Sequence, residues 1–131
     1  MNMIVAADKK NGIGYQGKLL VTIPFDQQLF RKETIGKVVV MGRKTLESLP
    51  GGRVLEGRTN IVLTRNKNYK CKGAIICHSV EAVLEEIKKY RSEDVYIIGG
   101  ESVYQAFMPY ADRIHMMQTR SFQKFRLTSG H

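Results

Sequence analysis

The chain has 131 residues, 43% of them hydrophobic, which suffices for one packed domain and not for two. It contains no apolar run of about 18 residues that could span a membrane, and residues 1–8 lack the basic start and long apolar run of a secretory signal. We therefore expect a cytoplasmic protein. The net charge of +9 favours a polyanionic ligand, such as nucleic acid, a membrane surface or a phosphorylated cofactor.

The first part of the chain predicts a strand, a loop and a helix. Residues 3–7 are an apolar run typical of a central strand, and residues 13–20 form a glycine-spaced loop. Pro24 fits the first turn of the helix that follows. On this helix Asp26 shares the inward face with Phe30. A carboxyl group on an apolar face is either functional or a cap of the first helical turn, and this segment alone leaves both open.

Two later segments share one pattern, in which a buried strand is followed by glycine and then by a helix. The apolar run 38–41 ends at Gly42, and the run 95–98 ends at Gly99-Gly100. A helix that begins after residues without Cβ atoms offers N–H groups to an anion such as a dinucleotide pyrophosphate. Glycine also has a purely steric role in many strand-to-helix turns, so this pattern alone does not show that a ligand binds there.

Basic and hydroxyl side chains accompany these strand ends. Arg43, Lys44 and Thr45 follow the first glycine, and Thr64 and Arg65 end a third predicted strand. Cations at the start of a helix oppose the helix dipole, so their presence indicates an anion between them. Phosphate oxygens suit all five side chains through charge-assisted and hydroxyl hydrogen bonds.

The remaining pattern completes an α/β domain. Residues 74–77 predict a fourth strand, and residues 80–90 predict an amphipathic helix with a structural role. Cys71 and Cys77 lack a second cysteine pair for a metal site and a secretory context for a disulfide, so we expect reduced thiols and no metal. Alternating strands and helices predict a mostly parallel sheet, which binds ligands at the carboxyl ends of its strands.

The order and spacing of these features resemble dihydrofolate reductase of the bacterial type over residues 1 to about 112. The motifs that carry the resemblance are Ile4-Val5-Ala6-Ala7, Gly12-Ile13-Gly14, Ile23-Pro24 with Asp26 and Phe30, Val40-Met41-Gly42-Arg43-Lys44-Thr45 with Glu47-Ser48, Arg58 with Asn60-Ile61-Val62-Leu63, and Ile98-Gly99-Gly100 with Tyr104. The resemblance implies one α/β domain whose mostly parallel mixed sheet is flanked by helices. It also implies that NADPH reduces dihydrofolate to tetrahydrofolate.

The same resemblance implies roles for single residues. Asp26 would be the catalytic acid that holds the pterin ring and assists its protonation, and Arg58 would pair with the glutamate carboxylate of folate. Arg43 and Arg65 would favour the 2′-phosphate of NADPH over NADH. The implied substrate-binding residues are Ile4, Val5, Ala6, Leu19, Phe30, Leu49, Arg58, Ile98 and Tyr104. The implied cofactor-binding residues are Ala6, Ile13, Gly14, Gly42, Arg43, Lys44, Thr45, Leu63, Thr64, Arg65, Gly99, Gly100, Glu101, Ser102, Val103 and Tyr104.

Two regions depart from the family pattern. Val21 stands where the family usually has tryptophan, which removes an indole donor near the acid and predicts weaker catalysis. Residues 115–131 form a basic tail without the family's closing strands, so we expect a reductase domain over residues 1–114 and missing or altered strands after it. An uncovered sheet edge would follow, with marginal stability or self-association of a chain that the family predicts to be a monomer.

Three functions remain open from the sequence. The first is an NADPH-dependent reductase. The second is a non-catalytic remnant that binds NADPH or folate without efficient turnover. The third is a polyanion-binding protein that uses the basic tail, which is disfavoured because the tail has no aromatic-basic motif beyond Phe122 and Phe125. On the resemblance we expect no nucleic-acid or membrane partner.

Overall fold

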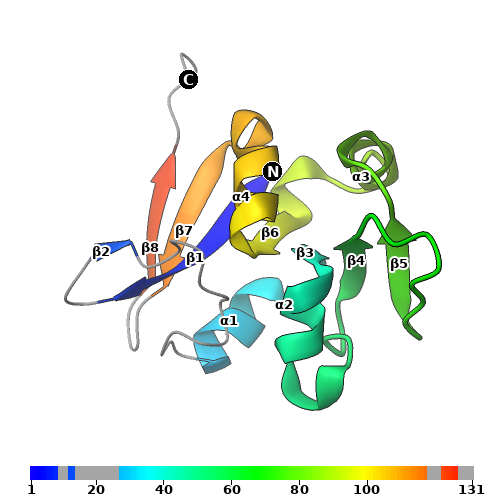
Figure 1. Cartoon of the computed structure of the whole chain (residues 1–131). Coiled ribbons are helices and arrows are strands. Elements are labelled where there is room, and N and C mark those ends of the chain that lie inside the picture. The colour runs from blue at the N-terminus through cyan, green and yellow to red at the C-terminus, as the bar shows by residue number, and fades with distance from the viewer. Residues whose placement is uncertain (9–11, 14–26, 118–121, 127–131) are drawn as a thin grey trace.

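The computed structural model describes residues 1–8, 12–13, 27–117 and 122–126 (Figure 1). The strands are β1 (Asn2–Asp8), β2 (Gly12–Ile13), β3 (Val38–Gly42), β4 (Thr59–Leu63), β5 (Ala74–Cys77), β6 (Val95–Gly99), β7 (Arg113–Met117) and β8 (Phe122–Arg126). The helices are α1 (Gln27–Thr34), α2 (Arg43–Ser48), α3 (Val80–Ile87) and α4 (Glu101–Phe107), and three short 3-10 turns are η2 (Pro50–Gly52), η3 (Ser92–Asp94) and η4 (Met108–Tyr110). No helix within these ranges is long and apolar enough to cross a membrane.

The strands form one eight-stranded sheet in the order β5-β4-β3-β6-β1-β7-β8, with β2 paired to β1 outside this path. The strands from β5 to β7 are parallel, whereas β2 and β8 are antiparallel to their neighbours. A parallel sheet is covered on both faces, so its strands are continuous apolar runs, and every residue of β6 is buried. The expected α/β fold with a mostly parallel mixed sheet is confirmed.

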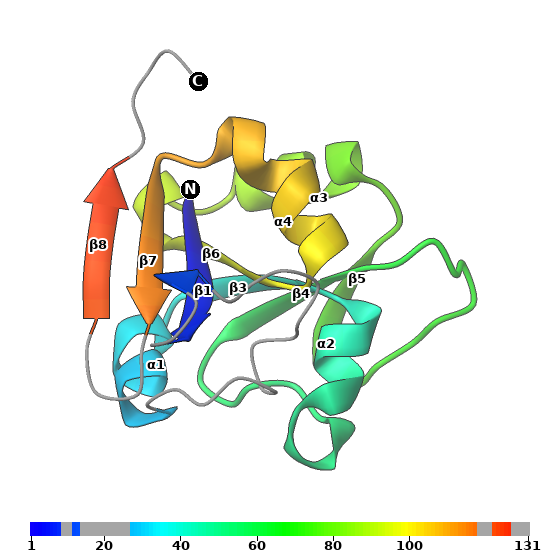
Figure 2. The ribbon, with the colours of Figure 1, turned by 60° about the vertical axis from the view of Figure 1, so that its left-hand side comes forward.

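The two faces of the sheet carry two separate apolar cores, because successive residues of a strand point to opposite sides. On β6, Tyr96 and Ile98 face one core, while Val95 and Ile97 face the other. Helices α1 and α2 cover the first face, and α3 and α4 cover the second (Figure 2). Each helix thus buries its apolar stripe on the sheet, and the strand ends between the helix pairs remain accessible.

The C-terminal region extends the sheet where the sequence predicts none. Strand β7 pairs with β1 in parallel from Asn2↔Arg113 to Ala6↔Met117, and β8 returns antiparallel beside it. The sequence predicted closing strands that are missing or altered, and the described residues contain one antiparallel strand, β8, beside β7. The expectation that this edge of the sheet is uncovered is therefore wrong for these residues. Sheet pairing uses backbone N–H and C=O groups, which every residue except proline supplies, so the basic composition of the tail did not exclude it.

Candidate active site

A cavity of about 780 Å³ opens at the carboxyl ends of β3, β4, β5 and β6. The first residues of α2, α3 and α4 contribute to its wall. Most of the lining residues are among those that the sequence predicts to bind the cofactor. They come from three separate segments, which the fold brings together. The lining residues predicted from the sequence are Gly42, Arg43, Lys44, Thr45, Leu63, Thr64, Arg65, Gly100, Glu101, Ser102 and Val103.

The two glycine corners meet at this cavity because β3 and β6 are neighbours in the sheet. A Cβ atom on Gly42 would lie 3.2 Å from Val103 Cγ2 and 4.0 Å from the Gly99 carbonyl oxygen. A Cβ atom on Gly99, whose φ is +123°, would lie 3.1 Å from the Tyr104 hydroxyl. The absence of a side chain therefore lets the backbone of the two corners pack closely against Val103 and Tyr104 of α4.

Positive charge gathers at the rim of the cavity. Arg43, Lys44 and Arg65 are exposed there, and the 3.9 Å ion pair between Arg43 and Glu47 is an exposed contact of little energy. Thr64 is buried, and its Oγ1 accepts a hydrogen bond of 3.2 Å from the backbone N–H two residues later. The hydroxyl proton of Thr64 is then available to a ligand oxygen.

The Thr45 hydroxyl is a buried polar group on the same wall. The residue is 1% exposed, and its Oγ1 has no hydrogen-bond partner in the described part of the chain. An unpaired buried hydroxyl costs about 1–3 kcal/mol, so this position indicates a ligand atom that hydrogen-bonds there. Among the described side chains none caps the N-terminus of α2 or α4, and their first N–H groups add donors to the wall.

Four lining residues were missed by sequence reasoning, namely His78, Ser79, Val80 and Ala106. His78 Nδ1 lies 2.9 Å from the carbonyl oxygen of Thr64 and donates to it, which leaves Nε2 as the nitrogen available to a ligand. His78 directly follows β5, and ligands gather at the carboxyl ends of parallel strands. The rule that ligands bind at strand ends, applied to the predicted strand 74–77, indicates His78 as a site residue.

A second group of predicted residues forms an apolar wall beside the cavity. Ile4, Phe30, Leu49 and Ile98 belong to the core under α1 and α2, and each is at most 7% exposed. Ile98 immediately precedes the glycine corner of β6, so the apolar wall and the cavity adjoin. Val5, predicted with this group, faces the opposite core because strand residues alternate, so its side chain does not contribute to the wall.

Tyr104 is buried beneath this junction. Its one hydroxyl proton is shared between the carbonyl oxygens of Ile4 at 2.7 Å and Ile98 at 3.0 Å. Strands β1 and β6 pair at Asn2↔Tyr96 and Met3↔Ile97. The phenol of Tyr104 joins the same two strands one residue further along, at Ile4 and Ile98. Burial raises the pKa of Tyr104 and keeps the phenol protonated. The sequence predicts that Tyr104 contacts a ligand. In this structure its side chain connects the ends of β1 and β6.

Arg58 lies half-buried at the C-terminal end of α1. Its Nη1 donates to Thr34 Oγ1 at 3.3 Å and its Nε donates to the Glu56 carbonyl oxygen at 2.9 Å. Burial, followed by the nearby Arg31 guanidinium, lowers the pKa of Arg58. Two neighbouring guanidinium groups favour a carboxylate ligand between them.

The loop that carries Arg58 is held by one buried amide. Asn60 Nδ2 donates to the carbonyl oxygens of Leu55 at 2.9 Å and Arg58 at 3.0 Å, and its Oδ1 accepts from the Leu55 N–H at 2.9 Å. Asn60 belongs to a motif of the family resemblance, and the sequence predicts no role for it. Its three hydrogen bonds make it a positioning residue for the arginine.

Some predicted site residues are not placed by the structure. Asp26, Gly14 and Leu19 lie outside the described residues. Ala6 and Ile13 are described by their backbones alone, Ala6 paired with Met117 in β7 and Ile13 paired with Ala7. Their roles stay predictions.

Comparison with known proteins identifies the family of the chain. The sequence matches the family model described as "Dihydrofolate reductase" over residues 1–126. A dihydrofolate reductase of Staphylococcus haemolyticus is 38% identical over 116 residues, which cover 88% of this chain and 68% of the relative. The chain belongs to the dihydrofolate reductase family. The family match continues through β8, beyond the last motif that the sequence offered.

Two further members of the dihydrofolate reductase family support the assignment. The enzyme of Enterococcus faecium is 41% identical over 105 residues, covering 79% of this chain and 62% of the relative. A solved structure described as dihydrofolate reductase from Enterococcus faecalis complexed with NADP(H) and RAB-propyl has a TM-score of 0.70 at 32% identity. That match covers 96% of this chain and 74% of the solved one.

Proposed function

We propose that this dihydrofolate reductase family member uses NADPH to reduce dihydrofolate to tetrahydrofolate. The observation that carries the proposal is the junction of a phosphate-suited cavity with an apolar wall at the end of β6. Reduction of a pterin ring requires a nucleotide and an aromatic substrate side by side, and this junction offers both surfaces. The protein's part is to bind, to orient and to exclude water.

The donor set of the cavity fits NADPH. The Thr45 hydroxyl and the first N–H groups of α2 and α4 suit pyrophosphate oxygens. Arg43 and Arg65 at the rim suit the additional 2′-phosphate, because a guanidinium binds phosphate through paired hydrogen bonds. When bound, NADPH supplies the hydride for the reduction. The Enterococcus faecalis relative, described as complexed with NADP(H), supports this cofactor.

The apolar wall and the arginine suit dihydrofolate. Ile4, Phe30 and Ile98 are apolar side chains of the kind that packs against a pterin ring, and Arg58 offers a charge for the glutamate carboxylate. Asp26 precedes Phe30 by one helical turn in the predicted helix, so its carboxyl group would lie on the side of this wall. There it would hold the pterin nitrogens and assist protonation of the ring.

The proposal is tested by NADPH oxidation with purified protein, with and without dihydrofolate. We expect loss of NADPH absorbance that depends on dihydrofolate, and a rate at least about 100-fold lower in Asp26→Asn, since general acid catalysis contributes about 10²–10⁴-fold. Glu81→Gln, which changes an exposed carboxylate on α3, is the matched control and keeps the wild-type rate.

The other outcomes have definite meanings. Equal rates for wild type and Asp26→Asn would contradict the role of Asp26. NADPH binding without oxidation would instead establish the non-catalytic remnant. Salt-dependent nucleic-acid binding that is lost on deletion of residues 119–131 would point to the basic tail as the functional element.

A further inference from the structure

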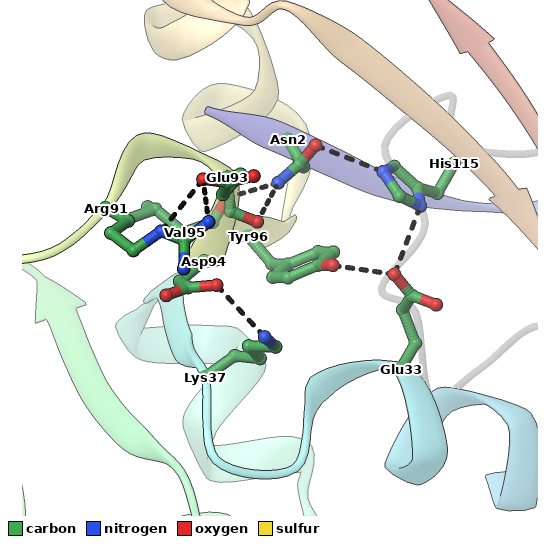
Figure 3. Close-up of polar contacts among 9 residues, drawn as sticks. All are labelled: Asn2, Glu33, Lys37, Arg91, Glu93, Asp94, Val95, Tyr96 and His115. Atoms are coloured by element: carbon green, nitrogen blue, oxygen red, sulfur yellow. Dashed lines mark hydrogen bonds and ion pairs between the residues drawn. The ribbon is translucent and has the colours of Figure 1, made fainter.

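Helix α1 is attached to the sheet through a polar cluster that neither ligand surface includes. The cluster consists of Asn2 on β1, Glu33 on α1, Tyr96 on β6 and His115 on β7 (Figure 3). Tyr96 Oη donates to Glu33 Oε2 at 2.6 Å, and His115 Nδ1 lies 3.7 Å from the same oxygen. One carboxylate oxygen of the helix thus contacts two neighbouring side chains of the sheet.

Asn2 determines how the imidazole of His115 is oriented. Both protons of Asn2 Nδ2 are used, by the carbonyl oxygens of Glu93 at 2.9 Å and Val95 at 3.2 Å. Asn2 Oδ1 is therefore the acceptor, and His115 Nε2 donates to it at 3.1 Å. The other ring nitrogen then faces the carboxylate of Glu33, as Figure 3 shows.

The sheet side of the cluster is buried and packed. Asn2, Tyr96 and His115 are each at most 4% exposed, and the Tyr96 and His115 rings meet edge to face with centroids 5.3 Å apart. Burial, followed by the hydrogen bond to Glu33, raises the pKa of Tyr96, so the phenol remains a donor. A buried polar group is satisfied in few geometries, whereas an apolar contact tolerates sliding. The cluster therefore defines where α1 lies along the sheet.

The position of α1 affects the residues predicted to bind the substrate. Phe30 of the apolar wall lies one turn before Glu33, and Thr34, which holds Arg58 at 3.3 Å, follows it directly. Phe30 is therefore on the same helix as Glu33, and Arg58, on the loop before β4, is held by the last residue of that helix. The cofactor cavity has no lining residue from α1 in the described part of the chain.

We propose that Glu33, held by the Tyr96 hydroxyl and facing His115, is a positioning residue that places α1 for the binding of the folate substrate and leaves NADPH binding unaffected. The inference rests on the proposed reductase function. By this inference, Glu33 and Tyr96 affect the affinity for dihydrofolate although neither is predicted to contact dihydrofolate or NADPH. The defining signature is a change in KM and Kd for dihydrofolate without a change in Kd for NADPH.

The primary test is Tyr96→Phe, which keeps the ring and its contact with His115 and removes the hydroxyl. We expect KM and Kd for dihydrofolate to rise about 2- to 30-fold, the range by which residues remote from a ligand modulate its binding. Kd for NADPH, measured by calorimetry, stays within about twofold. Tyr110→Phe, at an exposed tyrosine after α4, is the matched control and leaves both affinities at the wild-type value.

A second pair of variants separates positioning from general loosening. Glu33→Ala removes the acceptor and raises KM for dihydrofolate, whereas Glu33→Gln keeps an acceptor for Tyr96 and restores most of the affinity. The double variant Glu33→Ala with Tyr96→Phe equals Glu33→Ala alone, since the Tyr96 hydroxyl has already lost this acceptor once the carboxylate is removed. These variants also keep the test decisive if Tyr96→Phe does not fold.

Three results would overturn the inference. The first is an unchanged KM for dihydrofolate in both Tyr96→Phe and Glu33→Ala. The second is an equal loss of affinity for NADPH and dihydrofolate. The third is additive effects in the double variant. If wild-type protein does not oxidise NADPH with dihydrofolate, the proposed function fails, and Kd for dihydrofolate alone still tests the positioning role.

Discussion

Replacement of Thr45 by valine should have opposite effects on the ligand-free protein and on the NADPH complex. Valine has nearly the shape of threonine and removes only the Oγ1 group, which is buried without a hydrogen-bond partner among the described residues. Without ligand, the unpaired buried hydroxyl lowers the stability of the folded protein by about 1–3 kcal/mol. We therefore expect Thr45→Val to raise the free energy of unfolding by about 1 kcal/mol. Most buried polar-to-apolar changes act in the opposite direction because the polar group has a partner.

With NADPH, the same hydroxyl gains a charged acceptor in the phosphate. A hydrogen bond to a charged group contributes about 1.5–3 kcal/mol, so its loss should raise Kd for NADPH about 10- to 150-fold. The assays are urea unfolding without ligand and a fluorescence titration with NADPH. Thr45→Ser is the control, because it retains the hydroxyl and removes a buried methyl group. It should keep Kd and lose about 1 kcal/mol of stability.

Two results would refute this reasoning about Thr45. A Thr45→Val protein that is less stable than wild type without ligand would mean that the hydroxyl is already satisfied in the free protein. An unchanged Kd for NADPH would mean that the hydroxyl does not contact the cofactor.

Three further predictions test other parts of the site. Gly99→Ala should destabilise by about 2–3 kcal/mol in urea unfolding, because φ is +123° and a Cβ would press on the Tyr104 hydroxyl, whereas Gly36→Ala, with open space around it, costs about 1 kcal/mol. Asn60→Ala should raise KM for dihydrofolate about tenfold and leave KM for NADPH unchanged, since it frees the loop that carries the arginine; equal changes in both values would contradict it. Above about pH 10 the free energy of unfolding should fall, because burial raises the pKa of Tyr96 and Tyr104 and the unfolded state then binds fewer protons. Each phenol contributes up to about 1.4 kcal/mol per pH unit, and Tyr104→Phe should remove its share of that slope.

Much of the fold was readable from local sequence pattern. The runs 38–41, 74–77 and 95–98 are apolar without alternation, which is typical of strands in a parallel sheet covered by helices, and each is a strand of the parallel sheet. Glycine at the end of two of these runs marked the corners where β3 and β6 meet the cavity. The phosphate-suited residues lie directly after these strands, so the rule that ligands bind at strand ends was sufficient to group them.

The alternation of strand residues is also contained in the sequence. Ile4 and Val5 are adjacent, and a period of two places them on opposite faces. The structure accordingly puts Ile4 in the apolar wall and Val5 in the other core. His78 likewise follows a predicted strand and was missed.

Tertiary structure alone decided the rest. Strand β7 forms because its backbone reaches β1, more than 100 residues earlier, and backbone pairing leaves little trace in side-chain composition. The cluster of Asn2, Glu33, Tyr96 and His115 combines four elements, and nothing in the neighbourhood of any one of them in the sequence indicates the other three. Sequence pattern records what each segment buries, whereas long-range contacts depend on which segments the completed sheet places side by side.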